Sequence, residues 1–350
     1  MTTPEAFFNS TPIIMVNGEE RGDVSDALGS MVVNQVLRGS AHAELSFSNW
    51  GTPEGGQEPD FLFADILPGA EIDIQMRQPD PVVIFSGEVT AIEEEYGEGA
   101  PLLTLLLQDK LHRLARKRQN RVYEEQSPDD VIQALAGDLG LSTDVQVSGI
   151  VDSWHQINES DLAFMLRICD RFDISPRISD GSLRARSEES DSAPVELSAQ
   201  DNAIQVRLTA DLNHQPKSSI SQGYNLATGE AVDHSSNSMT PAPSATSAAD
   251  TLSELSWEGE EIIPQPFARS VAEAEAYAKA HFRRQARRFI QGDIICQGDA
   301  ALRSGREVEL SGVSPRLSGR YQVAHCTHRF DRRSGFETHI KVNRSDWSPA

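Results

Sequence analysis

The sequence predicts a β-rich α+β fold, in which two β-strand regions flank a region of helices and a mobile linker. Apolar and polar residues alternate with a period of two in residues 10–112 and again after Gly292, as in half-buried strands. Residues 127–175 instead show the period of amphipathic helices. Residues 227–256 are rich in Ser, Thr, Ala and Pro, which is typical of an exposed linker. Because two similar β regions surround the helices, the layout suggests an internal duplication.

The first β region is expected to form a small barrel or sandwich. Alternation marks strands at residues 41–47 and 72–77. A strand at residues 85–92 contains Gly87, which suggests a bulge or a close backbone approach. Residues 102–107 are nearly all apolar, as in a strand buried on both faces. Turns rich in Gly and Pro separate these segments, as they do between the short strands of all-β domains.

The middle region is expected to contain two amphipathic helices and a short hairpin. Ser127 suits the N-cap of the first helix, Pro128 its first position and Gly140 its end. A second helix is expected at residues 160–172, where apolar residues recur at helical spacing. The pair Asp180-Gly181 marks the hairpin turn.

A third helix follows the linker. Ser270 and Glu273 have the spacing of a capping box, and the helix is expected to continue to about residue 289. One interpretation of the arginines in its last turns is a patch for phosphate or for an acidic neighbouring subunit. The favoured interpretation is that they are surface charges that complement the helix dipole. These arginines are Arg283, Arg284, Arg287 and Arg288.

After Gly292 the sequence returns to strand patterns punctuated by glycines. Four strands are expected, at residues 293–296, 307–311, 321–325 and 338–342.

Composition and charge exclude several classes of function. The formal net charge is −22, which argues against binding to nucleic-acid phosphates or to anionic membranes. The three cysteines, Cys169, Cys296 and Cys326, do not form a disulfide framework and fit a reducing cytoplasm. No signal peptide is expected, and no stretch approaches the roughly 18 apolar residues of a membrane span.

No catalytic or cofactor motif survives inspection, so no catalytic, cofactor-binding or metal residue is assigned. The segment from Gly312 through Ser314 to Arg316 lacks the final glycine of a nucleophile elbow. The pair Gly97 and Gly99 lacks the third glycine of a dinucleotide-binding loop.

Two further groups of residues allow a chemical interpretation, which in each case is the weaker one. Cys326 and His328 are expected on one face of a strand and could ligate zinc, but two ligands do not make a site. A barrel strand with a buried cysteine is favoured. The run Glu93-Glu94-Glu95 could supply a glycosidase carboxylate pair. Adjacent residues of a strand face opposite ways, so a solvated strand end is favoured.

Two segments resemble a known family in the order and spacing of their motifs. The first comprises residues 106–114, 127–132, 156–164 and 180–183, in which Gln156 to Phe164 has the pattern Q-x-N-E-S-D-x-x-F. The second runs from residue 272 to Thr338 and includes His328-Arg329-Phe330 and Gly335-Phe336-Glu337-Thr338. Together they resemble the phage late control gene D family, which includes the baseplate hubs of P2-like and Mu-like phages. This family is similar to the N-terminal half of VgrG proteins of type VI secretion.

The resemblance implies a non-enzymatic, homotrimeric baseplate hub. Each subunit would give two barrel-like tube domains to a pseudo-sixfold ring, which adapts a sixfold tail tube to a threefold spike. The domain boundaries expected on this basis are residues 1–112 for the first tube domain, 113–194 for an α/β lateral domain, 195–226 with 290–346 for the second tube domain, 227–256 for the flexible linker and 257–289 for a helix of the lateral region.

The same resemblance implies the partners. These are two further copies of the chain, a separate spike protein below, a tail tube or tube-initiator protein above, baseplate wedge proteins at the side, and a tape measure protein or cargo in the lumen. A separate spike is expected because the sequence stops at Ala350, just after the second β region. Assembly in the bacterial cytoplasm and incorporation into a tail baseplate or injection particle are expected, without cofactors, specific nucleic-acid binding or membrane insertion.

Two alternatives and one hypothesis accompany this interpretation. The chain could be a cell-wall hydrolase of the tail tip or a VgrG-type secretion spike component. The hypothesis is that acidic residues line the lumen and prevent DNA or an acidic effector from sticking, because the net charge is −22.

Overall fold

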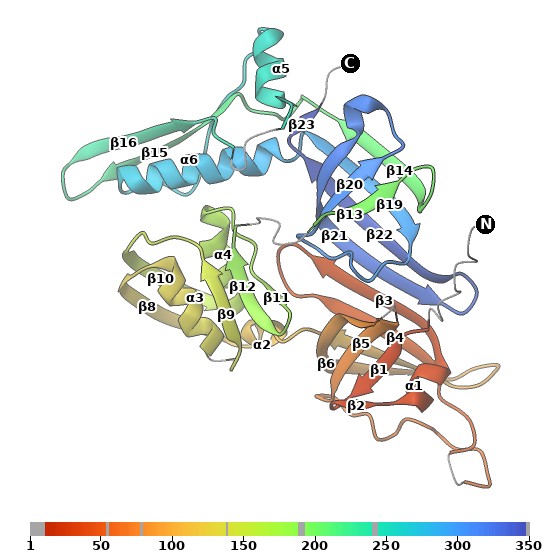
Figure 1. Cartoon of the computed structure of the whole chain (residues 1–350). Helices are drawn as coiled ribbons and strands as arrows, with labels where there is room; N and C mark the ends of the chain where they lie inside the picture. Colours follow the sequence, from red (N-terminus) through yellow and green to blue (C-terminus); the bar gives the residue numbers. More distant parts are fainter. Residues whose placement is uncertain are drawn as a thin grey trace.

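A computed structural model describes residues 11–53, 56–77, 80–137, 139–187, 193–239 and 244–347. Its main feature is a 13-stranded, mainly antiparallel sheet that passes through both β regions (Figure 1). The order of the main path is β14-β19-β22-β21-β3-β4-β7-β6-β5-β1-β2. Off this path, β20 pairs with β21 and β13 pairs with β20. The β-rich α+β class predicted from the sequence is confirmed.

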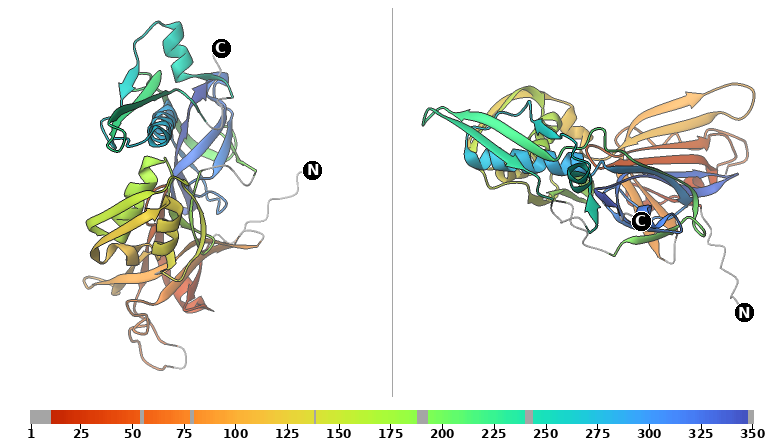
Figure 2. Two further views of the ribbon diagram at one scale, coloured as in Figure 1. Left: turned by 90° about the vertical axis from the view of Figure 1, so that its left-hand side faces the viewer. Right: turned by 90° about the horizontal axis from the view of Figure 1, so that it is seen from above.

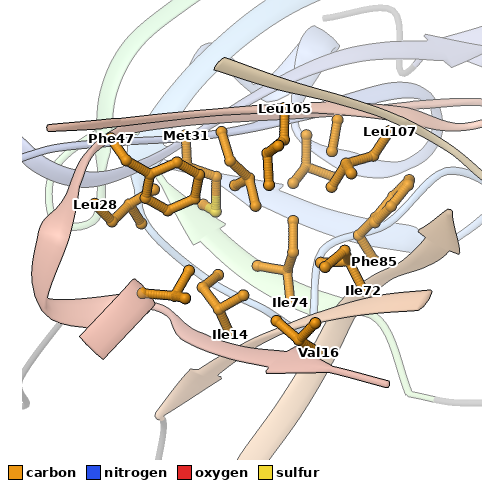
Figure 3. Packing of buried hydrophobic residues seen from close by; sticks show 14 of the residues in the cluster. Ile14, Val16, Leu28, Met31, Phe47, Ile72, Ile74, Phe85, Leu105 and Leu107 are labelled. Carbon is orange, nitrogen blue, oxygen red and sulfur yellow. The ribbon is translucent and has the colours of Figure 1, made fainter. Parts of the chain in front are cut away.

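The first β unit is built from residues 13–108 and encloses an apolar core. The strands expected from alternation are present, and their inward residues belong to one cluster. The strand expected at residues 102–107 is also present, but the expectation that both its faces are buried is wrong, because Leu103, Leu105 and Leu107 are buried whereas Leu102 is 41% exposed. Figure 3 shows side chains from β1, β3, β4, β5, β6 and β7 pointing toward one another. The elements are β1 (Ile13–Val16), β2 (Glu19–Glu20), α1 (Gly22–Ala27), β3 (Leu28–Val36), β4 (His42–Ser48), β5 (Glu71–Arg77), β6 (Pro81–Glu95) and β7 (Leu102–Gln108).

Gly87 lies in β6 at a close approach, as one of its two interpretations predicted. A Cβ atom at this position would stand 2.4 Å from the backbone oxygen of Gln108. The irregularities of β6 lie elsewhere, because its register against β7 shifts between Val89 and Ala91 and its register against β5 shifts between Val83 and Phe85.

The second β unit forms around its own core. The four strands expected after Gly292 are present, although three of them are longer than predicted. The elements are β13 (Val195–Ser198), β14 (Ala203–Ala210), β19 (Ile290–Gln297), β20 (Glu307–Ser311), the 3₁₀ turn η1 (Pro315–Leu317), β21 (Gly319–Asp331) and β22 (Gly335–Arg344). The short strand β23 (Asp346–Trp347) follows.

The two β units repeat one topology. In chain order the strands β3, β4, β5, β6 and β7 lie side by side as β3-β4-β7-β6-β5. The strands β14, β19, β20, β21 and β22 lie as β14-β19-β22-β21-β20, which is the same permutation with the same antiparallel pairings. The duplication suggested by the sequence is therefore present in the fold.

The two units are fused into one sheet by β3 and β21. These strands pair antiparallel over seven residues, from His325 opposite Val36 to Asp331 opposite Ser30. Phe330 of β21 reaches the core of the first unit, so the joint is both hydrogen-bonded and packed.

The remaining elements form a lateral body on one side of the two units (Figure 2). Its first part follows the first unit, and both helices expected there are confirmed. Its elements are α2 (His112–Ala115), β8 (Arg118–Gln126), α3 (Pro128–Gly137), β9 (Ser142–Gln146), β10 (Asp152–Ser160), α4 (Asp161–Arg171), β11 (Arg177–Ser179) and β12 (Ser182–Arg186).

The second part of the lateral body is inserted between β14 and β19. It contains β15 (Ser218–Asn225), β16 (Glu230–Ser236), β17 (Thr246–Ser247), α5 (Ala248–Glu254), β18 (Glu260–Ile262) and α6 (Val271–Ala286). Figures 1 and 2 show the β15–β16 hairpin beside α6. Both parts share one core, to which Val232 and Tyr277 contribute from the insertion.

Three expectations for this insertion need correction. Residues 227–256 are not a linker throughout, because they contain β16 and α5; residues 240–243 lie outside the described part of the chain. Residues 218–225 form β15, which pairs with β16 and β18 rather than with strands of the second β unit. The helix ends at Ala286, three residues before Phe289. Most side chains of β16 face solvent, so its polar sequence resembles a loop.

Candidate assembly interface

The outward face of the large sheet carries charges of both signs. Across the second unit Arg207 stands opposite Asp293, and Asp293 stands opposite Lys341. Nearer the joint, Arg329 stands opposite Glu337. Opposite charges at directly facing positions of an antiparallel sheet stabilise the pairing. In the second unit this face is therefore polar and carries both signs of charge, whereas the first unit adds the acidic residues Glu44, Glu93 and Glu95.

Asp109 fixes the exit from the first β unit into the lateral body. Its carboxylate accepts hydrogen bonds from the Ser40 hydroxyl and the Ala41 amide, both at 2.6 Å, and from the Leu111 amide at 3.0 Å. Burial raises the pKa of Asp109, and these donors oppose that shift by stabilising the charged form. The residue belongs to the first family-like segment, and its contacts are structural.

Glu88 makes a second buried anchor at the same exit. Its carboxylate accepts from His112 at 3.1 Å and from the Arg113 Nε at 3.0 Å. Burial alone would raise the pKa of Glu88, but the hydrogen bonds from Arg113 and His112 outweigh it and lower the pKa. Helix α2 is thereby attached to strand β6 of the first unit.

A cluster of arginines joins the first unit, α4 and α6. It surrounds Asp173, whose side chain is 1% exposed and lies just after α4. Arg38, from the β3–β4 loop, donates to Asp173 at 2.9 Å, and Arg287, the C-cap residue just after α6, also binds it. Arg283 and Arg284 lie within 3.8 Å of the same carboxylate. We call this set, with Asp170, the arginine clamp.

The clamp corrects the favoured interpretation of the α6 arginines. Three of them point inward to carboxylates of the same chain instead of forming a surface charge at the helix end. Burial lowers the pKa of Arg283 and of Arg284. The negative charge of Asp173 opposes this shift at Arg283, and that of Asp170 opposes it at Arg284. Sequence reasoning missed Arg38 and Asp173, because nothing local marks two residues that are 135 positions apart.

The most specific family-like segment, Gln156 to Phe164, forms a strand-to-helix turn. Ser160 caps α4 by accepting from the Ala163 amide at 3.2 Å. The side-chain amide of Gln156 donates to the carboxylate of Asp161 at 2.8 Å. Glu159 binds Arg167 through both carboxylate oxygens, at 2.9 and 2.8 Å. The side chains of this segment bind one another and the backbone, so its role is to fix the turn.

Cys326 and His328 point into the core of the second unit, on one face of β21 as expected. Nδ1 of His328 lies 3.1 Å from the Thr338 hydroxyl, and its Nε2 lies 3.0 Å from the Leu302 carbonyl oxygen. Burial lowers the pKa of His328 to about 4. Both ring nitrogens thus have protein partners, as in a core histidine. No group of three or more potential metal ligands occurs in the described residues.

The carboxylates Glu93, Glu94 and Glu95 lie exposed on β6, beside an exposed aromatic cluster. Trp50, Phe61 and Tyr96 are 44%, 41% and 62% exposed. Their rings are nevertheless in contact, edge to face, with centroids 5.2 and 6.3 Å apart. Large aromatic side chains held in place at a surface are typical of protein interfaces.

A cleft between α6, β14 and β18 is lined by acidic and amide side chains. Its lining includes Asp211, Glu260 and Glu261, and Glu261 binds His281 of α6 at 3.1 Å. This is a place where the hydrolase alternative could find two carboxylates. No helix in the described residues is long and apolar enough to cross a membrane.

The fold defined by the duplicated β unit and its lateral body is found in phage tail proteins and in type VI secretion. The 43 kDa tail protein of prophage MuSo2 from Shewanella oneidensis aligns with a TM-score of 0.71 and 13% identity, over 97% of this chain and 99% of that one. A tail protein from Neisseria meningitidis MC58 aligns with a TM-score of 0.67 and 11% identity, over 96% and 97%. A type VI secretion component of E. coli, described as structurally similar to tail proteins of bacteriophage T4, aligns with a TM-score of 0.60 and 11% identity, over 92% and 76%.

The chain belongs to the family described as the Alg8 N-terminal domain, whose pattern matches residues 10–331. None of the curated proteins compared matches the chain in sequence. The fold implied by the resemblance to phage baseplate hubs is thus confirmed.

Proposed function

We propose that the chain is a structural subunit of a baseplate hub, in a contractile phage tail or a phage-derived injection system. Three copies would form a ring to which each copy gives two β units. The observation that carries this proposal is the repeated strand order in one continuous sheet. Because the two units of a copy are near-equivalent, three copies present six similar units, and such a ring matches both threefold and sixfold neighbours.

The proposed division of labour follows the elements. The two β units would form the tube, and the lateral body would contact baseplate wedge proteins. One end of the ring would receive a separate spike and the other the tail tube or its initiator. If the outward face of the large sheet lines the lumen, a tape measure protein or cargo would meet Arg207, Arg329 and Lys341 as well as Glu44, Asp293 and Glu337. Glu93 and Glu95 of β6 lie on the same face, and this excess of acidic side chains supports the hypothesis of an acidic lining.

A non-enzymatic role is part of the proposal. Cys326, His328 and three of the four arginines are engaged in packing or in ion pairs within the chain, and Glu93 to Glu95 lie exposed on β6. Cys326 and His328 contact the core, and the α6 arginines hold two carboxylates. Assembly in the bacterial cytoplasm fits the three buried, free cysteines.

Mass in solution together with negative-stain microscopy tests the hub. We expect particles of three times 38.4 kDa, with a ring of threefold or pseudo-sixfold appearance. A chain that stays monomeric even in the presence of its spike partner contradicts the proposal.

A zymogram on purified peptidoglycan tests the hydrolase alternative. No clearing is expected from the full chain. Clear lysis that is lost on changing Glu260→Gln would instead support an active cleft at α6 and β18, and would overturn the non-enzymatic role.

A further inference from the structure

The second half of β6 has a free backbone edge in the described part of the chain. Strand β6 pairs with β5 through residues 81–88 and with β7 through residues 88–95. On the β5 side, the last contacts are hydrogen bonds between Val89 and Gly69 and Ala70, at 2.8 and 3.0 Å. Beyond Val89 this edge has no strand partner among the described residues. An unpaired strand edge is a template for another strand.

The equivalent half of β21 is covered by β3. Strand β21 shifts register between Val323 and His325, as β6 does between Val89 and Ala91. Val323 exchanges hydrogen bonds of 2.8 Å with residues 305 and 306, as Val89 does with residues 69 and 70. Gly69 and Gly305 even share a positive φ, of 92° and 84°. From His325 onward, β21 pairs with β3.

Strand β14 is the equivalent of β3, and one of its edges is also unpaired among the described residues. Each pairs with the next strand of its unit and shifts register after the first pair, at Leu28/Ser30 in β3 and at Ala203/Gln205 in β14. The other edge of β3 is covered by β21, whereas β14 has β19 as its sole strand partner in the described residues. Each copy therefore contains one complete joint, between β3 and β21. It also contains two unpaired strand edges, on β14 and on the second half of β6, that correspond to the two sides of such a joint.

We propose that β14 of one copy pairs antiparallel with the second half of β6 in the next copy, and so repeats the β3–β21 joint between subunits. This inference rests on the proposed ring and names the contact that closes it. The register copied from the internal joint places Ala91 opposite Asp211 of the neighbour, Glu93 opposite Thr209, Glu95 opposite Arg207 and Tyr96 opposite Val206.

Charge complementarity supports this register. Exposed Glu95 would directly face exposed Arg207, and Glu93 would lie diagonally across from the same guanidinium on the same face of the sheet. Facing opposite charges favour the pairing, and diagonal neighbours remain within reach of a long side chain. The acidic run that is solvated in the single chain thus acquires a partner.

Apolar exposure supports it as well. Tyr96 is 62% exposed, and Ile204 of β14 is 60% exposed. The internal equivalent of Tyr96 is Phe330, which is 6% exposed because it packs into the core of the adjoining unit. Tyr96, held by Phe61, would enter the core of the second unit of the neighbouring copy in the same way.

Disulfide cross-linking of the full chain tests the register. The double variant Glu95→Cys/Arg207→Cys should give covalent dimers and trimers under mild oxidation, because residues directly opposite in an antiparallel pair have Cβ atoms about 5 Å apart. Each single variant should stay uncross-linked, since the native cysteines are buried. The register control Glu94→Cys/Arg207→Cys, whose side chains would face opposite ways, should cross-link much less.

Charge reversal tests the pair by mass in solution. Arg207→Glu should weaken the trimer roughly tenfold or more, because like charges would face each other. Adding Glu95→Arg to Arg207→Glu should restore most of the trimer's stability. The control Arg77→Glu, at an exposed position on β5 away from the joint, should have little effect on the trimer. A monomeric wild-type chain contradicts the ring and the joint with it. A wild-type trimer that shows neither the cross-link nor the charge effect contradicts this joint alone.

Discussion

The two β units share one strand order but differ in the connection between their first two strands. In the first unit, β3 leads to β4 through residues 37–41. In the second, residues 211–289 separate β14 from β19 and build half of the lateral body. A strand pair tolerates such an insertion because the cost of closing a loop grows slowly with its length. The repeated β unit is therefore the scaffold, and the connection between its first two strands is where the second unit carries its inserted part of the lateral body.

The two connections also meet in space. Arg38 of the short loop and Arg284 and Arg287 of the long insertion bind the same two carboxylates, Asp170 and Asp173. The arginine clamp therefore attaches the insertion of the second unit to the first unit. Mutations in the clamp should have the largest effect on stability.

The largest expected effect is that of Asp173→Asn. Asparagine keeps the shape and tolerates the positive φ of 61° at this position, but it leaves the surrounding arginines without their central charge. Removing one partner of a buried ion pair costs about 3–5 kcal/mol. Urea unfolding measures the loss. The control Asp170→Asn, at a side chain that is 51% exposed, should cost less than about 1 kcal/mol. Equal losses would mean that the clamp does not depend on Asp173.

A matched pair of core truncations tests whether the two units are equivalent as scaffolds. Leu45 of β4 and Ile294 of β19 occupy corresponding positions. Leu45 lies opposite Leu105 of β7, Ile294 lies opposite Ile340 of β22, and both side chains are nearly fully buried. Leu45→Ala and Ile294→Ala should each cost about 3 kcal/mol in unfolding free energy. If one variant loses far more than the other, the cores differ in tightness despite their shared topology.

Much of each unit was predictable from its sequence, because inward and outward residues alternate along the strands. The caps of α3 and α6 were also predictable, and Ser127 and Ser270 accept the expected hydrogen bonds. The duplication left a short local signal as well. Residues 71–74 read Glu-Ile-Asp-Ile and residues 307–310 read Glu-Val-Glu-Leu, and both segments occupy the same place in their units.

Other features could not be predicted, because they depend on contacts between distant segments. The β3–β21 joint pairs residues almost 300 positions apart, such as Met31 with Phe330. Neither strand differs in pattern from its neighbours, so the sequence gives no sign that they meet. The polar strand β16 is recognisable only once α6 covers one of its faces.

The cores of the two units differ in chemistry, and this difference should appear in the pH dependence. The first unit has exposed Glu94 where the second has buried His328. The pKa of His328 is lowered to about 4, so the unfolded chain binds more protons than the folded chain between that value and the usual 6.5. Stability should therefore fall as pH falls from 7 to 5, by about 2 kcal/mol from this group.

The variant His328→Asn isolates that contribution. Urea unfolding at pH 7 and pH 5 should show a lower stability at pH 7 but a smaller drop between the two values. His339→Asn, at a half-buried position on β22, should leave the drop as it is in the wild-type chain. An unchanged drop in His328→Asn would assign the pH dependence to other groups that bind more protons in the unfolded chain than in the folded chain.

The smallest expected effect concerns a second ion pair that links the lateral body to a β unit. Arg303, before β20, binds Asp180 of the β11–β12 turn at 3.1 Å, but the two side chains are 44% and 76% exposed. Solvent weakens such a pair, so Arg303→Ala should cost less than about 1 kcal/mol, and the remaining effect should vanish at high salt. An ion pair at the buried Asp173 is thus expected to stabilise the fold several times more than the exposed pair of Arg303 and Asp180, because it is buried. A loss above about 2 kcal/mol for Arg303→Ala, measured by urea unfolding, would mean that the β11–β12 hairpin is as firmly seated against the second unit as α6 is against α4.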